Sequence, residues 1–198
     1  MIPDFLILPA VILAFITATS LLVSWNWRLS IFSLAIQYVC VVVLVSSSWP
    51  LETAAVKLVA GWMACAVMAL ALRNQPDDLI VGGGRSISDI VFRLIAAVMA
   101  GLFAFTGGTR LVLWLPEISV EQAYGSMILI ALGLLHLGLT NHPFRVVLGL
   151  LTLLSGFEIL YAAVESSILI AGLLAIVTLG LAIICAYLLT APTLEEAS

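Results

Sequence analysis

Residues 146–164 read VVLGLLTLLSGFEILYAAV, an apolar run that contains a single charged residue, Glu158. About 20 apolar residues of α-helix cross the roughly 30 Å hydrocarbon core of a bilayer. Arg145 precedes the run and Glu165 follows it, so polar residues mark both of its ends. The stretch therefore predicts a transmembrane helix with one carboxylate in its apolar part.

Six further runs of similar length and composition occur along the chain. Their residues are 5–24, 29–48, 54–72, 90–106, 122–140 and 168–190. Trp, Pro, Asn and Arg separate several of these runs, which is typical of the interfacial ends of membrane helices. The sequence therefore predicts an all-α polytopic integral membrane protein with seven transmembrane helices.

The composition of the 198 residues agrees with lipid as the solvent. Apolar residues make up 64% and mean hydropathy is +1.27. Charged residues make up 9%, against roughly 25% in a soluble domain. These values exclude a water-soluble globular domain and a disordered chain. The net charge of −4 and the scattered cations leave no basic stripe for nucleic acid.

The arginines predict an orientation, since short cytoplasmic loops of membrane proteins are rich in Lys and Arg. With seven spans, only Arg110 falls on one side of the membrane. The arginines that fall on the other side are Arg28, Arg73, Arg85, Arg93 and Arg145. We therefore expect an outside amino terminus and a cytoplasmic carboxyl terminus, with the chain in the inner (cytoplasmic) membrane.

Two of the connections between the runs are long. Residues 73–89 include the glycine triplet 82–84, which lacks the GK[ST] ending of a phosphate loop and predicts a flexible loop. Residues 107–121 begin with two glycines and include 111–115, for which we expect a short helix lying at the membrane surface.

Two carboxylates are candidates for proton transfer, one inside the run 146–164 and one directly after it. An uncompensated charge at the depth of Glu158 is costly, so the group must be protonated, partnered or in contact with water. Desolvation favours the neutral carboxyl, and a carboxyl that changes protonation is what a reversible proton carrier needs. Glu165 follows on the same helical face and extends the candidate path toward the outer surface. The alternatives are a permanently neutral Glu158 that bonds a neighbouring helix and a hydrated Glu165 at the helix end.

Lys57 is the single lysine of the chain and falls early in the run 54–72. Its long stem allows the ammonium to return to the outer interface, which is one interpretation. The other is a buried cation that pairs with a carboxylate on another span or subunit and exchanges protons.

Other polar residues inside the apolar runs have two interpretations. The imidazole of His136 suits a proton relay, but a lone membrane histidine more often makes a helix-to-helix hydrogen bond. Gln37 is expected to be a packing contact. Asp89 and Arg93 are four residues apart and predict an ion pair at the membrane interface.

The sequence lacks the motifs of several common classes of enzyme. The zincin H-E-x-x-H, the nucleophile elbow G-x-S-x-G and the dinucleotide fingerprint are all missing. Cys40, Cys65 and Cys185 stand singly in apolar runs, which predicts small buried side chains and neither a metal site nor a disulfide. We therefore expect no cofactor, no metal and no independent active site.

The stretch from Asn141 through Arg145 to Ala163 resembles the second span of the subunit K family of respiratory complex I. In that family a short cytoplasmic loop with Arg precedes a span with a Gly-Leu-Glu-Ile-like motif, here residues 156–159. The resemblance implies that Glu158 belongs to a chain of membrane ionisable groups used in proton pumping. The family's usual second glutamate has no counterpart within 168–190, and Glu165 precedes that run.

Length and span number also resemble component E of hydrogenase-4, whose carboxy-terminal half is similar to subunit K. Residues 19–23, 27–30 and 56–59, the last with Lys57, resemble the corresponding parts of component E. The resemblance implies a single membrane domain over 1–198. It would divide into three spans and a cytoplasmic loop at 1–89, a fourth span and outer loop at 90–120, and a subunit-K-like unit of three spans at 121–198.

These features favour a small, non-catalytic membrane subunit of a proton- or cation-translocating complex, with antiporter-like membrane subunits as partners. Its candidate relay residues are Glu158, Glu165, Lys57 and His136. One alternative is a structural or assembly subunit without an ion path of its own. Another is a free-standing small transporter. The first and last three spans also show a faint parallel at an offset of 117 residues, which aligns Arg28 with Arg145.

Overall fold

A computed structural model describes residues 6–73, 87–165 and 167–191, and within these ranges the chain is helical with no strand. Six of the helices are long and apolar enough to cross a membrane, whereas the first, with 17 residues, is shorter. The helices are α1 (Ile7–Val23), α2 (Trp27–Val45), α3 (Leu51–Arg73), α5 (Ile87–Trp114), α6 (Val120–Gly138), α7 (Pro143–Val164) and α8 (Ile168–Thr190). The predicted all-α class is confirmed, and the architecture agrees with a polytopic membrane protein.

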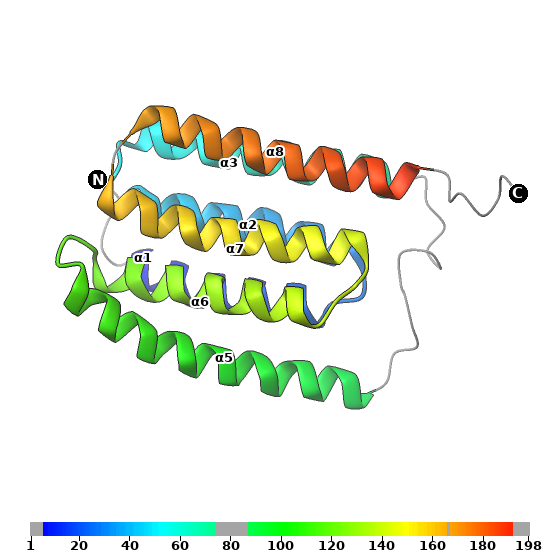
Figure 1. The fold of residues 1–198 in the computed structure, drawn as a ribbon, viewed down its shortest axis with the longest axis horizontal. Coiled ribbons are helices and arrows are strands. Elements are labelled where there is room, and N and C mark those ends of the chain that lie inside the picture. Colours follow the sequence, from blue (N-terminus) through cyan, green and yellow to red (C-terminus); the bar gives the residue numbers. More distant parts are fainter. Residues whose placement is uncertain (1–5, 74–86, 166, 192–198) are drawn as a thin grey trace, which may run out of the picture.

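The helices form two rows that lie against each other (Figure 1). Helices α1, α2 and α3 make one row, and α6, α7 and α8 repeat the same order in the other. As a result α1 packs on α6, α2 on α7 and α3 on α8, while α5 extends the bundle beside α6 and α1. Because successive helices alternate in direction, the paired helices are parallel. This arrangement agrees with the faint internal parallel expected between the first three and last three spans.

The described arginines separate between the two ends of the bundle. Helices α2, α5 and α7 begin, and α3 ends, at what we call the arginine end, where Arg28, Arg73, Arg93 and Arg145 lie. Arg110 lies in the last turns of α5, toward the opposite end. The separation that underlies the predicted orientation is therefore present in the fold, while Arg85 and the glycine triplet 82–84 lie outside the described residues.

Helix α5 corrects one expectation from the sequence. It continues without a break to Trp114, so residues 111–115 do not form a separate surface helix. The two glycines that follow the expected end of the span at residue 106 serve packing, because a Cβ at Gly107 would lie 2.5 Å from Met127, and one at Gly108 would lie 2.5 Å from Tyr124. Glycine lowers helix propensity by about 1 kcal/mol but does not end a helix that packs well.

Helices α6 and α7 have the most extensive contact of any helix pair in the bundle, and their backbones approach closely. A Cβ at Gly133 would lie 2.6 Å from the backbone nitrogen of Leu153, and one at Gly156 would lie 2.8 Å from the backbone nitrogen of Ile130. Small residues permit this approach in membrane helix pairs. Glu158 is therefore carried by a helix whose position is tightly determined.

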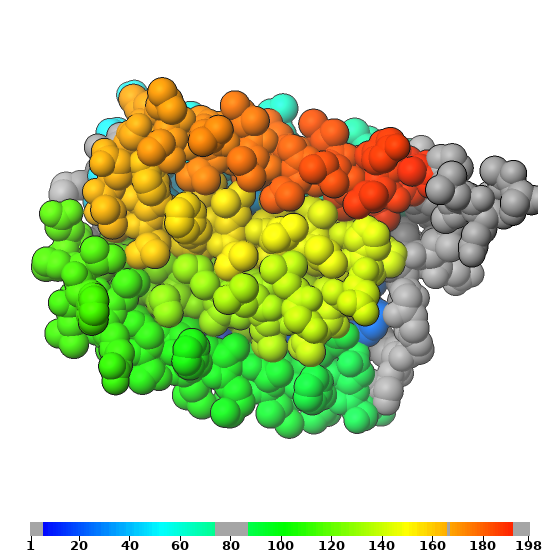
Figure 2. Space-filling view, viewed as in Figure 1, coloured from blue at the N-terminus to red at the C-terminus, as the bar shows by residue number. Residues whose placement is uncertain are grey.

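Apolar side chains cover much of the outer surface. Helices α5, α6, α7 and α8 lie side by side on the face in Figure 2, and α5 and α8 bury the smallest share of their residues among the long helices. Leu102, Phe103, Leu169 and Ile176 are among their exposed apolar residues. Such a surface suits contact with lipid chains.

Candidate functional site: a buried lysine–glutamate pair

The side chains of Lys57 and Glu158 meet inside the bundle. Nζ of Lys57 lies 2.7 Å from Oε1 of Glu158, and the two side chains expose only 3% and 2% of their surfaces. Lys57 therefore does not extend to the interface, which was one of its two interpretations. It takes the other arrangement, a buried cation paired with a carboxylate of another span.

The pair lies below the end of the bundle opposite the arginine end. Lys57 is six residues after the first residue of α3, and Glu158 is six residues before the last residue of α7. At 1.5 Å per residue, each group lies about 9 Å along its helix from that end. Helices α3 and α7 are not directly packed neighbours, so the ion pair connects α3 of one row with α7 of the other.

Tyr38 of α2 completes the polar surroundings of the pair. Its ring lies over Gly61, where any Cβ would overlap ring atoms, and Gly61 is one turn after Lys57 on α3. Glu158 lies within electrostatic range of Tyr38. Tyr38 is buried, and the absence of a side chain at Gly61 is what lets it lie beside the pair.

Two hydroxyl groups hold the phenol of Tyr38. Its side chain interacts with Ser155 of α7 and Thr178 of α8. Ser155 donates its own hydrogen to Leu151 O at 2.8 Å, and Thr178 donates to Leu174 O at 2.9 Å. Both hydroxyl oxygens therefore keep free lone pairs, and the single hydrogen of the Tyr38 phenol can be donated to one of them. We call Lys57, Glu158, Tyr38, Ser155 and Thr178 the inner polar cluster.

An aromatic pair lies between Glu158 and the nearer end of the bundle. The rings of Trp49 and Tyr161 meet edge to face with centroids 6.5 Å apart, and Trp49 is 4% exposed. Nε1 of Trp49 donates a 3.1 Å hydrogen bond to the backbone carbonyl of Glu165. Trp49 thereby fixes the last turn of α7 above the inner polar cluster.

Glu165 is not part of the cluster. It is the C-cap residue of α7 and is exposed, seven residues from Glu158 or about 10 Å along the helix. This position agrees with the alternative of a hydrated carboxylate at the helix end.

His136 lies away from the pair, in the last turn of α6 near the arginine end. It is 1% exposed and within electrostatic range of Arg93 and Arg145. Its Nε2 atom has no hydrogen-bond partner among the described residues, so the expected helix-to-helix bond is not formed by that atom. Gln37 is likewise buried, and both amide atoms of its side chain lack partners in the described part of the chain.

A group of residues at the arginine end was missed from sequence. Arg93 pairs with Asp89 at 3.0 Å, as expected, but both Arg93 and Arg145 are 7% exposed and both donate to the carbonyl oxygen of Leu22. The last carbonyls of a helix lack intrahelical partners and favour cations. The sequence did contain one signal for this group. It predicts the arginines at the same membrane face as the end of the first span.

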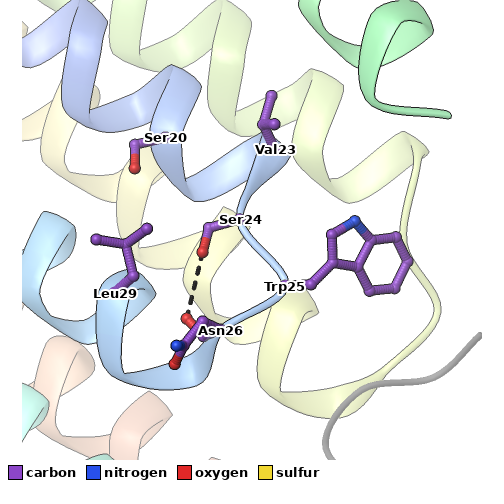
Figure 3. Close-up of a pocket in the computed structure, with 6 residues that line it drawn as sticks. All are labelled: Ser20, Val23, Ser24, Trp25, Asn26 and Leu29. Carbon is purple, nitrogen blue, oxygen red and sulfur yellow. Dashed lines mark hydrogen bonds between the residues drawn. The ribbon is translucent and has the colours of Figure 1, made fainter. Parts of the chain in front are cut away.

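A hollow between α1 and α2 is a weaker candidate for a functional site. It measures about 340 Å³ and is lined by Ser20, Val23, Ser24, Trp25, Asn26 and Leu29, none of them charged. Figure 3 shows Ser24 donating to the backbone oxygen of Asn26, at 3.3 Å, while the indole of Trp25 points away from Ser20 and Leu29. This hollow offers no group for acid–base chemistry.

The three cysteines are free and buried, as expected for small apolar side chains. Among the residues that the structure describes, no three His, Cys, Asp or Glu side chains come together as a metal site.

Comparison of the chain with protein-family models, with curated protein sequences and with solved structures gives no match. The resemblance to subunit K and to component E therefore remains an expectation.

Proposed function

We propose that the chain is a small, non-catalytic subunit of a proton- or cation-translocating membrane complex, in which Lys57 and Glu158 form a proton-exchanging pair. The observation that supports the proposal is the 2.7 Å contact between two ionisable side chains that are almost fully buried. Ionisable residues inside membrane helices are costly and are kept mainly where they serve transport or a proton relay.

The chemistry of such a pair suits proton exchange. Two buried charges need each other, because their desolvation is offset only by mutual attraction and further hydrogen bonds. Transfer of one proton from Nζ of Lys57 to Oε1 of Glu158 gives a neutral amine and a neutral carboxylic acid. A change in local water or in a neighbouring charge would shift the balance between these two states.

Tyr38 supports the proposal from a third helix. Its hydroxyl lies with those of Ser155 and Thr178, so hydroxyl groups from α2, α7 and α8 gather near the carboxylate. Hydroxyl groups both donate and accept hydrogen bonds, which suits a short path for protons. Redox or antiport machinery in antiporter-like partner subunits would supply the driving force.

The experiment begins by extracting the chain from native membranes in mild detergent and identifying the proteins that remain bound. Inside-out vesicles that carry Glu158→Gln are then compared with wild type for proton uptake under the driving reaction of that complex. Proton uptake per assembled complex falls to background, whatever amount of complex assembles. Unchanged uptake in assembled complex would contradict the proposal, as would a chain that comes out alone.

A matched control separates the role of Glu158 from a general effect of lost charge. Glu117 is an exposed carboxylate in the connection between α5 and α6. Glu117→Gln makes the same chemical change and leaves proton uptake at the wild-type level.

One observation favours a second candidate, a structural or assembly subunit. The pair joins α3 to α7, two helices that have little other contact. If its purpose is only to hold the rows together, Glu158→Gln lowers the amount of assembled complex, and the complex that remains pumps normally. Measuring assembly and uptake on the same vesicles distinguishes the two candidates.

A further inference from the structure

A second cavity lies at the arginine end, at the opposite end of the helix bundle from the inner polar cluster. It measures about 450 Å³, within the range of small-molecule sites. The α1–α2 turn, the first turns of α5 and the α6–α7 connection contribute its walls. Its polar lining residues include Arg93, Thr140, Asn141 and Arg145, and Trp25 forms an aromatic wall.

Backbone carbonyls and one indole hold the two arginines in place. Nη2 of Arg145 lies 2.7 Å from Leu22 O, and Nη1 and Nη2 of Arg93 lie 3.3 Å from Leu22 O and 3.4 Å from Leu139 O. The ring centroid of Trp25 lies 4.6 Å from Cζ of Arg145 and 5.1 Å from Cζ of Arg93. The guanidinium groups are therefore positioned before any ligand binds.

The charge of this cavity is not balanced. Asp89 compensates Arg93 at 3.0 Å and is about one-third exposed, whereas Arg145 has no carboxylate partner among the described residues. Arg145 exposes only 7% of its surface. Its Nε and Nη1 atoms have no hydrogen-bond partner in the described part of the chain. A buried, unpaired guanidinium is costly unless an anion compensates it.

The pattern of donors indicates which anion fits. Guanidinium groups bind phosphate oxygens through short, charge-assisted hydrogen bonds. The side-chain amide of Asn141 adds a neutral donor to the same wall, whereas Thr140 already donates its hydroxyl hydrogen to His136 O at 2.8 Å. The indole of Trp25 points away from Ser20 and Leu29 (Figure 3), and Trp25 lines this cavity together with Arg93 and Arg145.

We propose that the cavity between Trp25, Arg93 and Arg145 binds a phosphate group, supplied by an anionic phospholipid headgroup or by free phosphate. The bound anion compensates Arg145 and joins the ends of α1, α5 and α7. This proposal does not depend on the Lys57–Glu158 pair, so the failure of either one leaves the other standing.

The test measures thermal unfolding of the purified full chain. One arm adds inorganic phosphate to the chain in a non-ionic detergent, with sodium chloride at equal ionic strength as the comparison. The other arm compares nanodiscs of phosphatidylcholine alone with nanodiscs that contain phosphatidylglycerol. A saturating ligand raises the Tm by about 5 °C or more, and the arm in which the rise occurs identifies the source.

Variants connect the rise in Tm to the cavity. Arg145→Gln abolishes it, whereas Arg28→Gln keeps it, because Arg28 is an exposed arginine at the same end of the bundle. If Arg145→Gln does not fold, Arg145→Lys keeps the charge but loses the planar donors, and its rise in Tm is reduced. A rise that is equal in chloride and phosphate and absent with phosphatidylglycerol overturns the proposal, as does an undiminished rise in a folded Arg145 variant.

Discussion

Nζ of Lys57 on α3 lies 2.7 Å from Oε1 of Glu158 on α7, although 101 residues separate them in the sequence. Neither side chain exposes more than 3% of its surface. The pair connects the two helix rows and is the feature on which both candidate functions depend.

Removing one member of the pair is expected to be more harmful than removing both. Lys57→Met and Glu158→Leu each leave a buried ionisable partner behind, which costs about 3–5 kcal/mol of unfolding free energy. The double variant with Lys57→Met and Glu158→Leu removes both ionisable groups and recovers most of that loss. Thermal unfolding of the four proteins in nanodiscs measures the coupling, and a double variant whose loss equals the sum of the single losses would show that the groups do not interact.

Gly156→Ala is expected to lower stability by about 1–3 kcal/mol. The added methyl would lie 2.8 Å from backbone atoms of Ile130 and Ser126, so α6 and α7 must separate. Gly172→Ala is the matched control, because a Cβ at Gly172 has no heavy atom within 4 Å among the described residues. Equal melting temperatures for the two variants would contradict the close packing of α6 on α7.

Labelling of single new cysteines tests the orientation predicted from the arginines. In intact cells a membrane-impermeant maleimide should label Arg110→Cys and should label Arg28→Cys only after permeabilisation. The native cysteines are buried and give little background. The opposite labelling pattern would reverse the predicted orientation, and labelling of both positions in intact cells would contradict their placement at opposite ends.

Trp49→Phe is expected to lower stability by about 1 kcal/mol. The substitution keeps an aromatic ring against Tyr161 but removes the hydrogen bond to the carbonyl of Glu165. Trp114→Phe serves as the comparison, since Trp114 is 84% exposed at the end of α5. The two variants differ in Tm if the indole bond holds the last turn of α7, and they do not differ if that bond is dispensable.

The helices could largely be predicted from sequence because a bilayer requires long, continuous apolar runs. The break expected after residue 106 was wrong for a reason that depends on tertiary structure. The side chains of Met127 and Tyr124 on α6 pack against Gly107 and Gly108. Nothing local in the sequence distinguishes a glycine that serves packing from one that ends a helix.

The site could be predicted only in part. Glu158 and Lys57 stood out singly, since a charge in an apolar run is rare, but local periodicity carries no information on a contact between residues 101 positions apart. The cavity at the arginine end was missed for a related reason. In the sequence Arg145 indicates only the orientation of the chain, because its contacts with Leu22 and Trp25 depend on how α1, α5 and α7 come together.

The most direct test of the central claim is proton translocation by the intact complex that carries the double variant with Lys57→Met and Glu158→Leu. This variant is expected to assemble, because neither charge is left unpaired, so loss of pumping cannot be attributed to loss of the subunit. We expect proton uptake into inside-out vesicles to fall to background at a wild-type amount of complex. Wild-type uptake by the double variant would contradict the claim that the pair exchanges protons.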